Sequence, residues 1–224
     1  LGTHMNSISS AWRLPLGVIV VCGCLIGVIS FGARAGFGLF LTPISQELNW
    51  GREIFALSIA IQNLIWGACQ PLAGALADKY GSGRVIAVGG VIYAAGVALM
   101  AYSSEPLQMH MTAGVLVGLG TAFGSFMIVM ASLARRVQPK WRSLVLGVAT
   151  ASGSIGQFTL VPIGQAFLKA YGWHTALLLL AAIVLLVVPL AGTVTGKGAP
   201  TPGVRDQTLR EALGEALKHK SYNL

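Results

Sequence analysis

The sequence predicts an all-α integral membrane protein whose six transmembrane helices form two inverted three-helix repeats. Three observations lead to this fold class. Hydrophobic residues make up 54% of the 224 residues and charged residues only 10%, whereas a soluble domain carries about 25% charged residues. Six apolar segments are present, and rare residues recur at one fixed offset between the first three and the last three. The composition excludes a soluble enzyme, a disordered chain and a secreted disulfide scaffold.

The apolar segments set the predicted domain boundaries. They cover residues 14–44, 53–77, 84–103, 107–134, 141–168 and 174–195, and a spanning helix needs about 20 residues. Residues 1–13 are interpreted as a vector-derived start followed by a cytoplasmic N-terminus. Residues 196–224 are interpreted as a cytoplasmic linker with a short amphipathic helix that presents Leu209, Leu213 and Leu217 on one face. We therefore expect a single membrane bundle over residues 14–195.

The basic residues predict how this bundle is oriented. With a cytoplasmic N-terminus, twelve Lys and Arg residues fall on the inner side, and only Arg52 and Lys169 fall on the outer side. Such an excess is typical of cytoplasmic loops. We therefore expect both termini to be cytoplasmic, in a plasma membrane or in the inner membrane of a bacterium. The net charge of +8 is spread over short loops, so membrane lipids and not nucleic acid are the expected surroundings.

An internal repeat relates segments one to three to segments four to six. The paired residues lie 91 positions apart: Trp50 and Trp141, Pro71 and Pro162, Tyr80 and Tyr171, Gly81 and Gly172. Three helices per repeat give the two copies opposite orientations in the membrane, which is the arrangement found in many secondary transporters.

Polar residues in segments two, four and five recur at helical spacing. The stripes include Ser58, Gln62, Trp66 and Gln70 in segment two, Ser125 in segment four, and Thr150, Ser154 and Gln157 in segment five. One interpretation is that Gln62, Trp66, Ser125 and Gln157 line a substrate cavity, with segments three and six facing lipid. The other is that small and hydroxyl-bearing residues make tight helix contacts.

Arg34 is the charged residue placed inside a predicted span. Burying arginine in a membrane is costly, by about 2.5–3.5 kcal/mol on insertion scales, and such residues usually line a pathway or form a pair. No acidic residue lies clearly within any span, so an anionic substrate is the expected partner, with Phe31 and Phe37 as walls. The alternatives are contact with a lipid headgroup and a structural bond to backbone carbonyls.

Other reactive chemistry is not expected from this sequence. Cys22, Cys24 and Cys69 fall inside apolar segments, where a thiol behaves as a small hydrophobe. No nucleophile–base set, acid/base pair or metal cluster is apparent, so we expect no cofactor, no metal and no enzymatic activity.

The loop between segments two and three carries the most specific motif. It runs from Gly74 through Asp78, Lys79 and Gly81 to Arg84 and resembles the signature loop of the major facilitator superfamily, although its basic cluster is thinner than usual. The resemblance implies a cytoplasmic gate formed by these five residues. In that gate Asp78 would accept hydrogen bonds from a neighbouring helix N-terminus and from an arginine.

The first segment sharpens this resemblance. The run from Phe31 to Ile44, followed by Glu47 and Trp50, is similar to the first helix of monocarboxylate and oxalate/formate porters. In monocarboxylate porters a lysine at the place of Arg34 serves substrate and proton recognition. Arginine keeps the charge but does not release its proton in the physiological range.

The resemblance covers the chain but only half of the twelve-helix family architecture. We therefore expect secondary transport of small organic anions, monocarboxylates above all, by alternating access. The partner would be a second six-helix half, either a C-terminal half or a second copy of this chain. The alternative is a non-transporting membrane module, such as a sensor or a stable proteolytic fragment.

Overall fold

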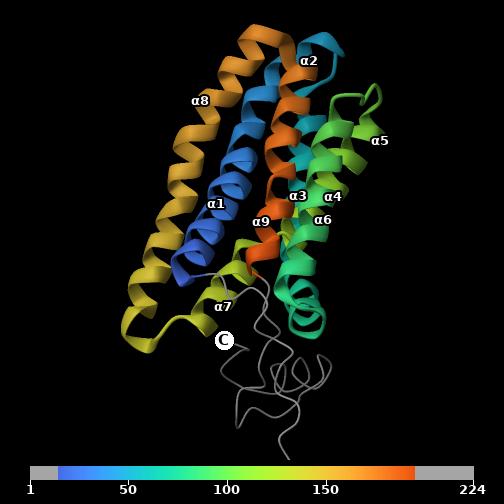
Figure 1. Cartoon of the computed structure of the whole chain (residues 1–224). Coiled ribbons are helices and arrows are strands. Elements are labelled where there is room, and N and C mark those ends of the chain that lie inside the picture. The colour runs from blue at the N-terminus through green and yellow to red at the C-terminus, as the bar shows by residue number, and fades with distance from the viewer. Residues whose placement is uncertain (1–14, 195–224) are drawn as a thin grey trace, which may run out of the picture.

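The computed structural model describes residues 15–194, and every element in that range is helical. The elements form an elongated bundle with neighbouring long helices running side by side (Figure 1). The predictions for residues 1–13 and for the amphipathic helix after residue 195 lie outside the described residues.

The first three predicted segments form three long helical stretches. The first comprises Leu16–Ala35 (α1), a 3-10 turn at Gly36–Phe40 (η1) and Leu41–Glu47 (α2); the others are Arg52–Tyr80 (α3) and Ser82–Met100 (α4). Pro71 lies inside α3 without interrupting it. Gly81 separates α3 from α4 with φ 95°, a conformation that side chains other than glycine rarely adopt.

The fourth segment is not the single helix that the sequence suggested. It consists of Pro106–Met109 (α5), a π-helical stretch at His110–Leu116 (η2), Val117–Phe123 (α6) and Phe126–Arg136 (α7). The interruption falls at Gly124 and Ser125, where Ser125 caps α7 by accepting a hydrogen bond from the Met127 backbone N–H at 3.2 Å. The serine thereby satisfies one of the amides that a helix start leaves free.

The last stretch covers 56 residues and comprises Pro139–Leu185 (α8), Val187–Ala191 (α9) and Gly192–Val194 (η3). Gly172 interrupts it with φ 75° and ψ 172°, and the chain turns back at this end of the bundle (Figure 1). Directly after the turn, the indole N–H of Trp173 donates to Glu47 Oε2 at 2.6 Å and ties the turn to α2. Five stretches of the described chain are long and apolar enough to cross a membrane.

A close helix contact joins α1 to α8 through two glycines. A Cβ at Gly32 would collide with the Gly156 carbonyl oxygen, and a Cβ at Gly156 would collide with Val28 backbone atoms. Small residues at such a crossing let two backbones approach within the membrane, where van der Waals packing drives association.

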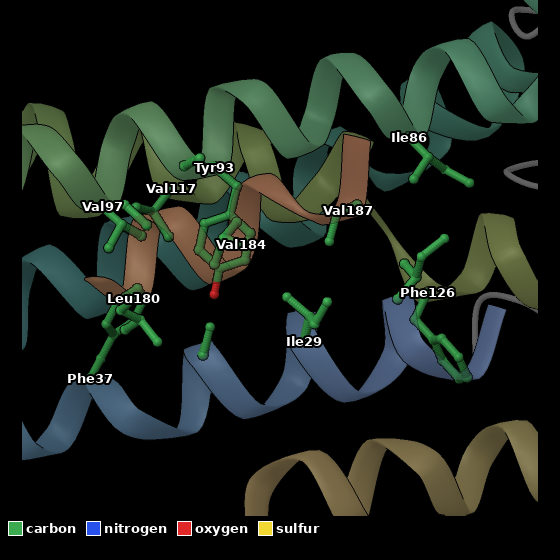
Figure 2. Close-up of a cluster of buried hydrophobic side chains, with 14 of the residues drawn as sticks. Ile29, Phe37, Ile86, Tyr93, Val97, Val117, Phe126, Leu180, Val184 and Val187 are labelled. Carbon is green, nitrogen blue, oxygen red and sulfur yellow. The ribbon is translucent and has the colours of Figure 1, made fainter. Parts of the chain in front are cut away.

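The buried core lies between α1, α4, α6 and the last stretch of the chain. Figure 2 shows Ile29 of α1 and Phe37 of η1 facing Tyr93 of α4 and Leu180 of α8 across this core. The Phe37 and Tyr93 rings meet edge to face, with centroids 6.4 Å apart. This geometry suits the quadrupoles of two aromatic rings.

The expected division between lipid-facing and inward-facing segments differs from the structure. The most apolar part of α4, expected to face lipid, is 56% buried, whereas that of α3 is only 17% buried. The reason is that α4 packs against α6, α8 and α9, so more of its surface is covered, although Val88, Val91 and Leu99 stay exposed. Helix α3 instead exposes Leu57, Leu64 and Leu72.

The Gly32–Gly156 crossing leads to a stability prediction. We expect Gly156→Ala to lower the stability of the bundle by about 1–3 kcal/mol because the new methyl group has no space. Gly147→Ala on the same helix is the matched control, since its Cβ meets nothing within 4 Å and alanine favours a helix by about 1 kcal/mol. Thermal unfolding in detergent measures both; a Gly156→Ala variant as stable as Gly147→Ala would contradict the packing.

Candidate functional site

Arg34 lies in the last turn of α1 and points to α3. Its guanidinium donates a hydrogen bond to Asn63 Oδ1, and its Cζ lies 4.5 Å from the centre of the Trp66 ring. Both contacts come from one helix, and both are made to side chains. The guanidinium is therefore held from two sides by α3.

The α1–α8 crossing explains why Arg34 points in this direction. Gly32 faces α8, and a residue two positions later on a helix lies about 200° around the axis. Arg34 must therefore project to the side opposite α8, where α3 lies.

Asn63 and Trp66 orient the guanidinium in complementary ways. The Asn63 amide nitrogen donates to the Ile59 carbonyl at 2.8 Å, which leaves its amide oxygen to accept from Arg34. Trp66 covers one face of the guanidinium, an arrangement worth about 0.5–1 kcal/mol at an exposed site and more where water is excluded. Among the described residues no carboxylate pairs with Arg34; the salt bridge found in this part of the chain joins Asp78 and Arg135.

The rest of the polar stripe on α3 contacts the fourth segment. The Ser58 hydroxyl lies 2.9 Å from His110 Nδ1, and Ser125 Oγ lies 3.3 Å from Gln70 Oε1. Gln62 is only 2% exposed, and its amide atoms have no hydrogen-bond partner within residues 15–194. Ser58 and Ser125 thus make contacts between helices, Gln62 is buried without a partner among residues 15–194, and Trp66 is the residue of the stripe that reaches Arg34.

Phe31 and Gln157 line a common cavity of about 260 Å³ between α1, α7 and α8. Phe31 meets Phe126 edge to face, with ring centroids 5.6 Å apart. Phe37, by contrast, is 2% exposed and belongs to the core. Its placement does not fit the role as a substrate wall that the sequence suggested. Phe31 in α1 contacts Phe126, whereas Phe37 in η1 contacts Tyr93.

The loop residues Gly74 to Arg84 lie at the end of the bundle opposite Gly172. Arg135 at the end of α7 donates to Asp78 Oδ1 at 3.5 Å and to Ser82 Oγ at 3.3 Å. An arginine thus contacts Asp78, whereas a bond from a neighbouring helix N-terminus to Asp78 stays a prediction.

The remaining loop residues have separate environments. Lys79 lies over the Tyr80 ring at 5.2 Å, and Arg84 is exposed. Gly74, Asp78 and Arg135 line a second cavity of about 190 Å³. Asp78 of the loop and Arg135 of α7 therefore form a charged pair in the lining of a cavity between α3 and α7.

Comparison with known proteins decides the family. The family model described as Major Facilitator Superfamily matches residues 23–221. The chain belongs to the major facilitator superfamily. Membership in this superfamily confirms the predicted family, fits a multi-pass membrane protein and argues against an enzyme.

Several curated relatives of this facilitator are monocarboxylate transporters. Monocarboxylate transporter 11 of Homo sapiens is 30% identical over 77% of the chain and 36% of the relative. Monocarboxylate transporter 2 of Mus musculus is 28% identical over 88% of the chain and 42% of the relative. Monocarboxylate transporter 1 of Bos taurus is 27% identical over 92% and 41%. The facilitator chain thus spans about two-fifths of the length of these relatives.

Sequence reasoning missed three residues of this facilitator. Asn63 lies one position away from the stripe on α3, and its only signal was an amide within an apolar segment. The sequence places Arg135 among the cytoplasmic basic residues but carries no signal for its pairing with Asp78. His110 was not considered, because nothing in the sequence brings it to Ser58.

The exposed Asp78–Arg135 pair should contribute little to stability. Asp78 is 67% exposed and Arg135 is 38% exposed, and pairs of this kind are typically worth about 0–1 kcal/mol. We expect a double-mutant cycle of Asp78→Asn and Arg135→Gln, followed by chemical unfolding, to give a coupling energy below about 1 kcal/mol. A coupling energy several times larger would show that the pair is a structural contact of the bundle.

Proposed function

We propose that the chain is the N-terminal half of a secondary transporter for small organic anions, chiefly monocarboxylates. The observation that carries this proposal is Arg34, which α3 holds through Asn63 and Trp66 without any carboxylate partner among the described residues. A cation on a membrane helix is costly, so an anionic substrate would complete the site. The names of the relatives support a monocarboxylate.

In this proposal the chain crosses the membrane six times as two inverted repeats. The left-handed Gly172, at which Figure 1 shows the chain turning back, would divide the last stretch into a fifth and a sixth pass. An even number of passes leaves both termini on one side, and the distribution of basic residues favours the cytoplasm. The Asp78–Arg135 end of the bundle would then be cytoplasmic.

The second half would cover the apolar surface of α3 and of the first part of α8. Large apolar side chains are exposed there, among them Leu64 and Leu72 on α3 and Val148, Ile155 and Phe158 on α8. A C-terminal half is the simpler partner, because the relatives are more than twice as long as the matched region. A second copy of this chain, related by an axis along the membrane normal, would place Arg34 in the site twice.

The gate would work through the contact between α3 and α7. The Asp78–Arg135 pair joins the two helices at the cytoplasmic end, next to the turn at Gly81 that leads from α3 into α4. Charge-assisted bonds are stronger than neutral ones, and exposure to water keeps this pair easy to break. Such a contact suits a switch between two packings of similar free energy.

The proposal is tested by uptake and binding together. Proteoliposomes of the chain are assayed for uptake of labelled lactate and oxalate, and equilibrium dialysis measures binding in lipid nanodiscs. We expect Arg34→Gln to lower anion binding at least about tenfold, since a charge-assisted bond is worth about 1.5–3 kcal/mol. Arg52→Gln is the matched control, because it removes an exposed arginine at the first residue of α3, away from Asn63 and Trp66.

The outcomes separate the parts of the proposal. Uptake that depends on Arg34 would mean that the chain suffices, as a dimer; binding without uptake would mean that a second half is needed. Equal binding by the parent chain and Arg34→Gln would contradict the anion site.

Asn63→Asp gives a second test of the same site. A carboxylate at this position would pair with Arg34 and compete with the substrate, so we expect anion binding to fall as far as in Arg34→Gln. Asn63→Ala removes the hydrogen bond but adds no charge, and we expect it to retain most binding. Equal effects of the two Asn63 variants in the dialysis assay would contradict direct competition for Arg34.

A further inference from the structure

The second cavity, at the Asp78 end of the bundle, has the size and the lining of a binding site. It lies between α3 and α7, and its lining includes Gln70 and Asp78 from α3 and Ile128, Ala131 and Arg135 from α7. Its volume of about 190 Å³ corresponds to roughly six water molecules at about 30 Å³ each. The space therefore suits a molecule of a few heavy atoms.

The guanidinium in this cavity is held loosely. Arg135 donates to Asp78 Oδ1 at 3.5 Å and to Ser82 Oγ at 3.3 Å, whereas charge-assisted bonds between nitrogen and oxygen usually measure about 2.7–2.9 Å. Asp78 is mostly exposed, and an exposed ion pair adds little to stability. A ligand can therefore take Arg135 from Asp78, because the displaced carboxylate stays in water.

The charges at this end of the bundle favour an anion over a cation. Within residues 15–194, Asp78 is the acidic residue at the end where α3 passes into α4 and α7 into α8 (Figure 1). The basic residues at the same end are Lys79, Arg84, Arg135, Arg136, Lys140 and Arg142. A surplus of one charge raises the local concentration of ions of the opposite sign.

The rest of the lining favours a carboxylate with a small apolar part. A carboxylate matches the planar fork of a guanidinium and accepts two parallel hydrogen bonds from it. Ile128 and Ala131 present apolar surface beside Arg135 in the lining. Gln70 Oε1 accepts from Ser125 at 3.3 Å, and its amide nitrogen remains as a donor. An acid of two or three carbon atoms uses both kinds of surface.

We propose that the second cavity binds a short-chain carboxylate, which takes Arg135 from Asp78 and thereby loosens the contact between α3 and α7. This site is separate from Arg34, which is not among the residues that line the cavity. The binding step does not depend on Arg34, and only its consequence for the gate rests on the proposed function.

The test measures acetate binding with the first site removed. Equilibrium dialysis of labelled acetate uses the chain in nanodiscs at constant ionic strength, with Arg34→Gln as the background. We expect Arg135→Gln to weaken the remaining binding at least about tenfold, as the loss of a charge-assisted hydrogen bond does. Asp78→Asn removes the competing carboxylate, so we expect acetate to bind about two- to fivefold more tightly.

These opposite signs separate a binding site from a structural contact. Both variants break the same ion pair, so a contact that only supports the fold would respond to both in the same direction. Arg136→Gln is the matched control for charge, because Arg136 does not line the cavity. We expect it to change acetate binding by less than about twofold, since salt screens charges that do not touch the ligand.

A second pair of variants tests the cavity and not the charge. Ala131 lines the cavity and is exposed, so a larger side chain there fills the space without entering the core. We expect Ala131→Leu to weaken acetate binding at least about tenfold, while Ala131→Ser, which is close to alanine in size, keeps it within about twofold. Thermal unfolding in the same nanodiscs checks that each variant is folded.

The outcomes distinguish this inference from the proposed function. No acetate binding in the folded Arg34→Gln chain, equal effects of Arg135→Gln and Arg136→Gln, or unchanged binding in Ala131→Leu would each overturn the second site. If Arg34→Gln does not fold, the parent chain gives the same test: the weaker of two binding phases should respond in opposite directions to Arg135→Gln and Asp78→Asn, and its absence would overturn the inference. Binding that needs Arg135 but is equal in the parent and Arg34→Gln would support the second site and contradict the proposed site at Arg34.

Discussion

The contact between α1 and α8 at Gly32 and Gly156 controls how the rest of the bundle is arranged. Neither residue can carry a side chain there, so the two backbones touch. Once Gly32 faces α8, helical geometry turns Arg34 to α3 and leaves Phe31 between α7 and α8. One close approach therefore divides the neighbouring faces of α1 into a charged side and an apolar side.

Polar groups in the membrane interior are satisfied mostly by contacts between α3 and the fourth segment. Ser58 pairs with His110 beside the π-helical stretch, and Gln70 meets Ser125 where the fourth segment breaks. Lipid offers no hydrogen bonds to such groups, and interrupted helices are tolerated where neighbouring protein supplies partners. The irregular backbone of this segment is thus coupled to the polar stripe of α3. The same stripe leaves Trp66 free to cover Arg34.

The two ends of the bundle are held together in different ways. At one end, Trp173 is 4% exposed and bonds to Glu47, so the turn at Gly172 is anchored to α2. At the other end, Asp78 and Arg135 form a long, exposed pair. The first contact has one buried partner, Trp173, whereas both partners of the second are open to water and salt, which weaken it. A bundle built in this way resists opening at the Trp173 end and yields more easily at the Asp78 end, which suits the proposed gate.

The sequence by itself determined the membrane class, the positions of the long apolar stretches, the signature loop and the presence of a cation, Arg34, within an apolar stretch. These follow from local properties: hydropathy over about 20 residues, the cost of a buried cation and glycine at a turn. Only the tertiary structure decided which neighbour each helix face meets. It brought Asn63 and Trp66 to Arg34, joined Arg135 to Asp78, buried Phe37 and Gln62, and covered α4 while exposing α3. In a chain whose helices are apolar on most faces, hydropathy cannot distinguish lipid from protein as the neighbour of a given face. Helix packing chooses between them through small residues and shape.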